Sequence, residues 1–137
     1  MPGKKNPNKR APQEQRARRV ALSELRTSSI LANCKSELQK SAGIKKNIDL
    51  ALKEASKPNP NPKPINNAIA LVETVIEGIQ RNRSNIANAL RSIRRIGLPK
   101  ETERSIRTLE IARQTLNDIL KEYKSTLRRL MEIKKGF

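Results

Sequence analysis

Apolar residues recur at alternating spacings of four and three through residues 65–93, which is the spacing of one α-helical face. The positions on this face are Ile65, Ile69, Val72, Ile76, Ile79, Arg83, Ile86, Leu90 and Ile93. Gly97 and Pro99 follow, and these residue types favour the end of one helix and the start of the next. A matching face comprises Ile106, Leu109, Arg113, Leu116, Leu120, Tyr123, Leu127 and Leu130. The pattern predicts an antiparallel helical hairpin over residues 65–137.

One arginine interrupts each apolar face of the predicted hairpin. Folding the helices back about Leu98 places Arg83 and Arg113 in the same layer of the seam. Two buried cations would cost several kcal/mol if left unpaired. We therefore expect this layer to open to water, or the guanidinium groups to reach acids such as Glu77 or Glu110 at the edge of the seam or to bind phosphate.

Further apolar residues beside the two faces widen each stripe beyond what a two-helix hairpin can cover. They are Ala68, Val75, Ala89, Ile96, Ile119 and Met131. A shorter helix is predicted over residues 44–55, with its own apolar face. This helix or neighbouring copies of the protein would cover the stripes, so we expect a small bundle that self-associates.

The N-terminal part of the chain is divided by its glycines and prolines. Residues 1–11 lack periodic apolar positions and predict a basic extended arm. Residues 12–57 predict a basic helical arm of two helices with a hinge near Gly43. Residues 58–64 alternate proline with polar residues, which suits either a stiff extended linker of about 20 Å or an ordinary loop. With the hairpin of residues 65–137, the predicted fold class is all-α.

The charge balance narrows the class of partner. Thirty Lys and Arg face 13 Asp and Glu, giving a formal charge of +17. Such an excess favours nucleic acid over an acidic protein or an anionic membrane surface. The longest apolar run, residues 68–72, is far too short to cross a bilayer, so no membrane insertion is expected. Only Tyr123 and Phe137 are aromatic, which argues against base stacking on single strands and favours phosphate contacts to a duplex.

Several function classes lack the residues they need. The chain has no histidine and one cysteine, Cys34, which excludes zinc knuckles, histidine acid–base chemistry and intramolecular disulfides. It has no glycine-rich phosphate loop and no nucleophile beside a base, so we expect neither an enzyme nor a cofactor. Zinc-finger spacing and a leucine zipper after the basic helix are also missing, which argues against sequence-specific regulation.

The first 35 residues carry nine Lys and Arg against Glu14 and Glu24. We predict phosphate contacts from Lys4, Lys5, Lys9, Arg10, Arg16, Arg18, Arg19 and Arg26. On a helix, Arg16, Arg19 and Arg26 share a face. A stripe on another side, of mostly small residues, would permit close approach to a helix or to the duplex. That stripe comprises Ala17, Ala21, Leu25, Ser28 and Ala32. A solvated surface is the alternative for the arginine face.

A second cluster interleaves arginines with asparagines, a combination suited to phosphates and sugar edges. Its predicted phosphate ligands are Arg81, Arg83, Arg91, Arg94 and Arg95, with Asn82, Asn85 and Asn88 between them. The alternative is an exposed face paired with acids of the return helix, such as Glu101 and Glu103. A third basic group, in residues 121–135, is diluted by Glu122 and Glu132 and is interpreted as surface and interface.

The basic arm and helix from Lys4 to Arg26, the break at residues 58–64 and the bundle from Ile65 to Lys135 together resemble the major coat (nucleocapsid) proteins of filamentous and rod-shaped archaeal viruses. In that family a basic helical arm wraps double-stranded DNA and a helical bundle forms the outer wall. The resemblance implies a virion protein that forms a homo-oligomeric filament, or assembles with a related coat chain, around a duplex in a dehydrated A-like form. Two alternatives stay open. One is a nucleoid- or ribosome-associated protein of the cytoplasm, and the other is a helical protein-interaction module with a basic tether.

Overall fold

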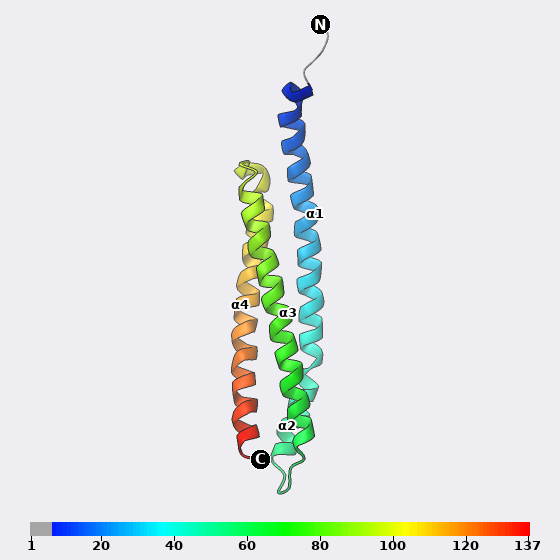
Figure 1. The fold of residues 1–137 in the computed structure, drawn as a ribbon, viewed down its shortest axis with the longest axis vertical. Helices are drawn as coiled ribbons and strands as arrows, with labels where there is room; N and C mark the ends of the chain where they lie inside the picture. The colour runs from blue at the N-terminus through cyan, green and yellow to red at the C-terminus, as the bar shows by residue number, and fades with distance from the viewer. Residues whose placement is uncertain (1–6) are drawn as a thin grey trace.

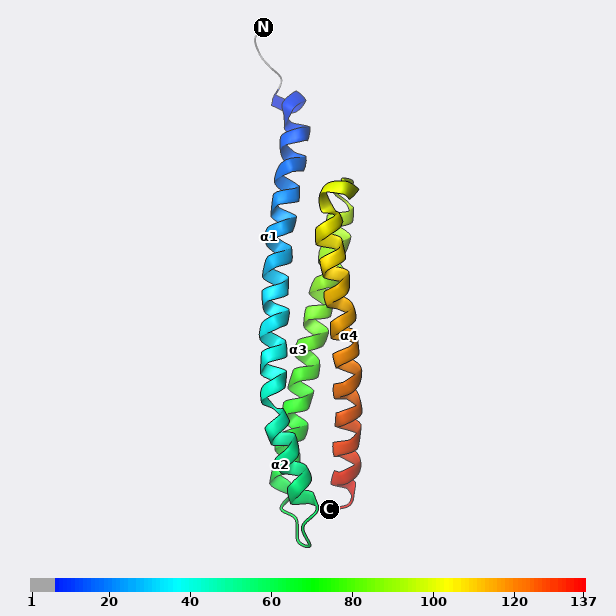
Figure 2. The ribbon, with the colours of Figure 1, turned by 180° about the vertical axis from the view of Figure 1, so that it is seen from behind.

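The computed structural model describes the backbone of residues 7–137 and the side chains of residues 12–137. Its helices are α1 (Pro7–Gly43), α2 (Lys45–Ala55), α3 (Pro62–Arg94) and α4 (Pro99–Lys135), and this part of the chain contains no strand. Helices α3 and α4 form an antiparallel hairpin, α1 runs beside it, and α2 lies at the end opposite the hairpin turn (Figures 1 and 2). The predicted all-α class is confirmed. None of these helices is long and apolar enough to cross a membrane.

The hairpin of α3 and α4 follows the predicted pattern closely. Every apolar position predicted for the α3 face is buried, from Ile65 to Ile93. On α4, Leu109, Leu116, Leu120 and Leu130 are buried, and the other predicted apolar positions are partly buried. Gly97 turns the chain with a φ of 72°, a conformation that favours glycine. Pro99 then occupies the first turn of α4, where a missing amide donor costs nothing.

The two seam arginines are not paired with the predicted acids: Glu110 pairs with Arg94, and none of the ion pairs of the described residues involves Arg83 or Arg113. Arg113 is exposed, and Ala112 beside it packs against the core. Arg83 is half-buried, while Asn82 is buried and donates its side-chain amide to the Gly78 carbonyl at 2.9 Å. The apolar face of a helix drifts because 3.6 residues make a turn, so a small or neutral neighbour can take the inner position.

Helix α1 is the third helix of the bundle and packs against both α3 and α4. Its inward face buries Ser23, Thr27, Ile30, Cys34 and Ser41. The three hydroxyls donate to carbonyls of the preceding turn at 2.7–2.8 Å, so they can be buried without loss of hydrogen bonding. Small side chains also allow the helices to approach closely.

The face that the sequence predicted for close approach lies on the solvent side of α1. Its members Ala17, Ala21, Leu25, Ser28 and Ala32 are all exposed, and Leu25 is 69% exposed. The prediction followed the apolar residues, but the side of α1 that packs inward carries Ser23, Thr27 and Ser41, whose hydroxyls donate to carbonyls of the same helix. Of the extra apolar positions of the hairpin, Ala68, Val75 and Ala89 are buried, Ile96 and Ile119 are half-buried, and Met131 is 47% exposed. Helices α1 and α2 pack against the hairpin, and α1 was the covering element that the sequence did not predict.

The helical boundaries correct one further expectation at the N-terminal side. Helix α1 begins at Pro7, so residues 7–11 are helical and not extended. It continues past the hairpin turn, so its N-terminal end stands clear of α3 and α4 (Figure 1). The end of α1 at Gly43 and the separate α2 match the predicted hinge and short helix.

The proline-rich segment is a tight loop and the start of a helix, so the extended linker is wrong and the ordinary loop is right. Pro62 and Pro64 lie in the first turn of α3, which tolerates proline. The Asn61 side chain caps this helix by accepting the Lys63 amide at 3.0 Å, and Glu54 of α2 accepts the Asn61 amide at 3.1 Å. Helices α2 and α3 therefore pack against each other directly.

Candidate nucleic-acid interface

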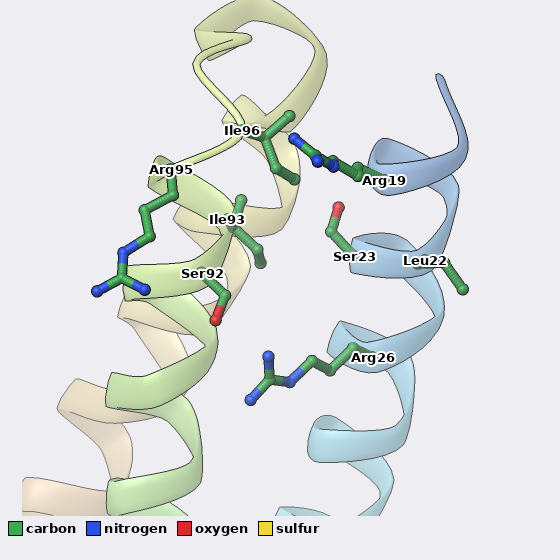
Figure 3. Close-up of a pocket in the computed structure, with 8 residues that line it drawn as sticks. All are labelled: Arg19, Leu22, Ser23, Arg26, Ser92, Ile93, Arg95 and Ile96. Carbon is green, nitrogen blue, oxygen red and sulfur yellow. The ribbon is translucent and has the colours of Figure 1, made fainter. Parts of the chain in front are cut away.

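Residues from the two predicted basic clusters meet in one groove between α1 and the C-terminal end of α3 (Figure 3). The groove encloses about 320 Å³. Its lining residues are Arg19, Leu22, Ser23 and Arg26 of α1, with Ser92, Ile93, Arg95 and Ile96 at the end of α3. Three of these residues are cations and none is acidic, so the groove is suited to an anion.

The helices set the spacing of the three arginines. Arg19 and Arg26 are seven residues apart on α1, which places them on one face about 10 Å apart along the axis. Both extend from α1 toward α3, whereas Arg95 extends from the end of α3 on the side away from α1 (Figure 3). An anion in the groove would therefore face Arg19 and Arg26, with Arg95 beside it at the end of α3.

The groove arginines have no acidic partners in the described part of the chain. Its ion pairs join Lys57 to Glu54, Arg94 to Glu110, Arg107 to Glu103 and Lys135 to Glu132. Arg94 thus follows the alternative interpretation, a cation paired with an acid of the return helix. Arg19, Arg26 and Arg95 form none of these ion pairs. Their guanidinium groups can therefore bind phosphate bidentately.

The groove floor is apolar beneath the charged rim. Ile93 is 1% exposed and Ile96 is half-buried, so apolar side chains line the groove between the exposed arginines. Ser92 is exposed in the groove and adds a hydroxyl that can donate to a phosphate oxygen.

The other predicted contact residues are distributed around this groove. Arg16 lies apart from Arg19 and Arg26, in a neighbouring hollow that it shares with Glu101 and Leu98. Arg18 is exposed on α1, and Arg81 and Arg91 are exposed on α3. Arg83 is half-buried, and its Nε is buried without a hydrogen-bond partner. Lys4 and Lys5, and the side chains of Lys9 and Arg10, lie outside the described residues.

The opposite flank of α1, which faces α4, has a different charge. A hollow there is lined by Glu24, Thr27, Ser28, Leu31, Glu101, Arg104, Ser105 and Thr108. Two carboxylates face one arginine, so this side does not attract an anion as the α3 side does. Of these two hollows beside α1, the one shared with α3 is therefore the more cationic.

Sequence reasoning found the groove arginines but missed Ser92, Ile93 and Ile96 as groove residues. Their role depends on where α1 docks, and no local pattern indicated that position. The described part of the chain has no group of three or more acidic or cysteine side chains placed to hold a metal ion. No protein-family model, curated protein or solved structure gives a significant match to this chain.

Proposed function

We propose that this protein is a structural nucleic-acid-packaging protein that binds duplex DNA through its phosphates, without reading base sequence. One observation carries the proposal: Arg19 and Arg26 of α1 and Arg95, the residue after α3, border a single groove that no acidic side chain lines. The net charge of +17 supports the same partner, because the excess must be neutralised for copies to lie close together.

In the proposed binding mode, both the groove and the basic residues near the N-terminus contact phosphates. Phosphates of one strand enter the groove and accept hydrogen bonds from the guanidinium groups and from Ser92. Lys4, Lys5, Lys9 and Arg10 are proposed to add further phosphate contacts. Phosphate contacts carry no base information, so affinity depends strongly on salt and weakly on sequence.

We further propose that many copies coat the duplex as a helical filament, as a viral major coat or nucleocapsid protein does, with the bundle outward and the virion as its location. The alternative is a cellular nucleoid- or ribosome-associated protein that binds in the same mode without a filament. The self-association that a filament needs, or assembly with a related coat chain, is part of this proposal.

Two neighbouring arginines test the binding mode. Arg95 borders the groove, whereas Arg94 is paired with Glu110. Arg95→Ala should weaken binding to duplex DNA by about tenfold at low salt, the effect of losing one charge-assisted hydrogen bond. It should also reduce the slope of log affinity against log salt by about 0.9. Arg94→Ala is the matched control and should change affinity by less than about threefold. Equal losses in the two variants would contradict the groove as the binding site.

Electron microscopy tests the assembly. The full chain is mixed at low salt with duplex DNA, with duplex RNA, and with no nucleic acid. Regular filaments that require one polymer would support the coat function and identify that polymer. Discrete complexes would support the nucleoid-type alternative, and the absence of any salt-dependent binding would refute the proposed function.

A further inference from the structure

Polar side chains continue from the groove along the flank where α1 meets α3. On α3, Ser92, Asn88, Asn85 and Arg81 are separated by four, three and four residues, so they share one helical face. All four are exposed. The groove is thus the upper end of a longer polar surface, which we call the flank track.

Helix α1 contributes to the same surface. Asn33 lies seven residues after Arg26, so it falls on the same face of α1, and its side chain is exposed. Two contacts fix the register of the helices on this flank. Arg26 and Ser92 line the groove together, and further along Glu37 of α1 lies against Gly78 of α3. Asn33, Asn85 and Asn88 therefore fall between these two contacts.

Acidic side chains stand at the far end of the flank track. The Glu37 carboxylate lies so close to Gly78 that a Cβ there would be 2.1 Å from its Oε1. Glu77 is the residue next to Gly78 and is exposed. A nucleic-acid strand that follows the amides from Arg95 would meet repulsion from two carboxylates beyond Arg81.

We infer that one strand of the duplex lies along the flank track, from Arg95 to Arg81, and that Glu37 and Glu77 end its contact with the protein. This inference rests on the proposed function and adds the path and length of the contact. Asparagine amides and serine hydroxyls bind phosphate and sugar oxygens, which suits a path between two groups of arginines. From Arg81 to Arg95 the track covers 14 residue steps at the end of α3, or about 21 Å, which is long enough to contact several phosphates of one strand.

The main test places a carboxylate in the middle of the flank track. Asn88→Asp changes one amide to a carboxylate of the same shape, and like-charge repulsion should weaken binding of the full chain to duplex DNA by at least about tenfold at low salt. Asn66→Asp is the matched control, because Asn66 is exposed at the other end of α3 and lies far from the track. That variant should bind within about twofold of the parent protein.

A second variant tests the end of the track. Glu37→Gln keeps the shape of the side chain against Gly78 but removes its charge, so affinity should rise about threefold and more phosphates should be contacted in the salt titration. Circular dichroism of each variant verifies that the helices are retained.

The outcomes separate the two proposals. If the parent protein fails to bind duplex DNA, both are refuted. If Arg95→Ala weakens binding while Asn88→Asp and Asn66→Asp behave alike, the flank track is refuted and the groove stands. If Glu37→Gln leaves affinity unchanged, the acidic end of the track is refuted.

Discussion

Replacing Gly78 with alanine tests how α1 is seated on α3. Gly78 is buried in the interior of α3, where glycine is less favourable than alanine by about 1 kcal/mol. An alanine Cβ would lie 2.1 Å from Oε1, 2.4 Å from Cδ and 2.7 Å from Oε2 of Glu37. These atoms form the end of a flexible side chain, so the carboxylate can rotate away without movement of the α1 backbone.

The expected free energies follow from these two effects. Moving the half-buried Glu37 side chain to another rotamer costs about 0.5–1.5 kcal/mol, which offsets the helix-propensity gain. Gly78→Ala alone should therefore change the free energy of unfolding by less than about 1 kcal/mol. In a Glu37→Ala background the obstacle is gone, and the same substitution should stabilise the protein by about 1 kcal/mol.

Urea unfolding followed by circular dichroism measures all four members of this double-mutant cycle. The gain in the Glu37→Ala background should appear as a higher urea midpoint with an unchanged slope, because the surface exposed on unfolding hardly differs. A loss of more than about 1 kcal/mol in that background would refute the reasoning. It would mean that the α1 backbone, and not the Glu37 carboxylate, limits the space at Gly78.

Two other predictions concern the same helix. Burial raises the pKa of the Cys34 thiol, and Cys34 is 5% exposed, so it should react with an aromatic disulfide reagent far more slowly in the native protein than in urea. Fast native reaction would mean that α1 leaves the hairpin in solution. Tyr123 donates a hydrogen bond from α4 to the Ser41 carbonyl of α1 at 2.9 Å, so Tyr123→Phe should lower the free energy of unfolding by about 1 kcal/mol in urea titrations. An unchanged midpoint would show that this bond adds nothing to stability.

The hairpin could be predicted from sequence because its largest side chains obey one rule. Isoleucines and leucines at helical spacing bury themselves together, and the largest fully buried side chains of the described chain lie on α3 and α4. Gly97 and Pro99 mark the turn for equally local reasons. The spacing placed Arg83 and Arg113 on the apolar faces, but Asn82 and Ala112 beside them point further inward. Charge decides which of two adjacent positions turns inward, and spacing alone does not indicate it.

The docking of α1 could not be predicted by the same reasoning. Its buried face combines Ile30 and Cys34 with Ser23, Thr27 and Ser41, whose hydroxyls are satisfied within the helix. Such a face has little apolar contrast with the exposed face that carries Leu22 and Leu25. The periodicity of polar and apolar residues was therefore a poor guide to which side of α1 faces the hairpin.

The candidate site combines a predictable part with an unpredictable one. Its arginines were evident from charge, because local acids are few around Arg19, Arg26 and Arg95. Their meeting in one groove is a tertiary property that depends on α1 docking in one register against α3. An anion held by α1 and α3 together binds only the docked state, so it must stabilise that docking by mass action. Phosphate binding and the docking of α1 against α3 are therefore thermodynamically linked, so each should strengthen the other.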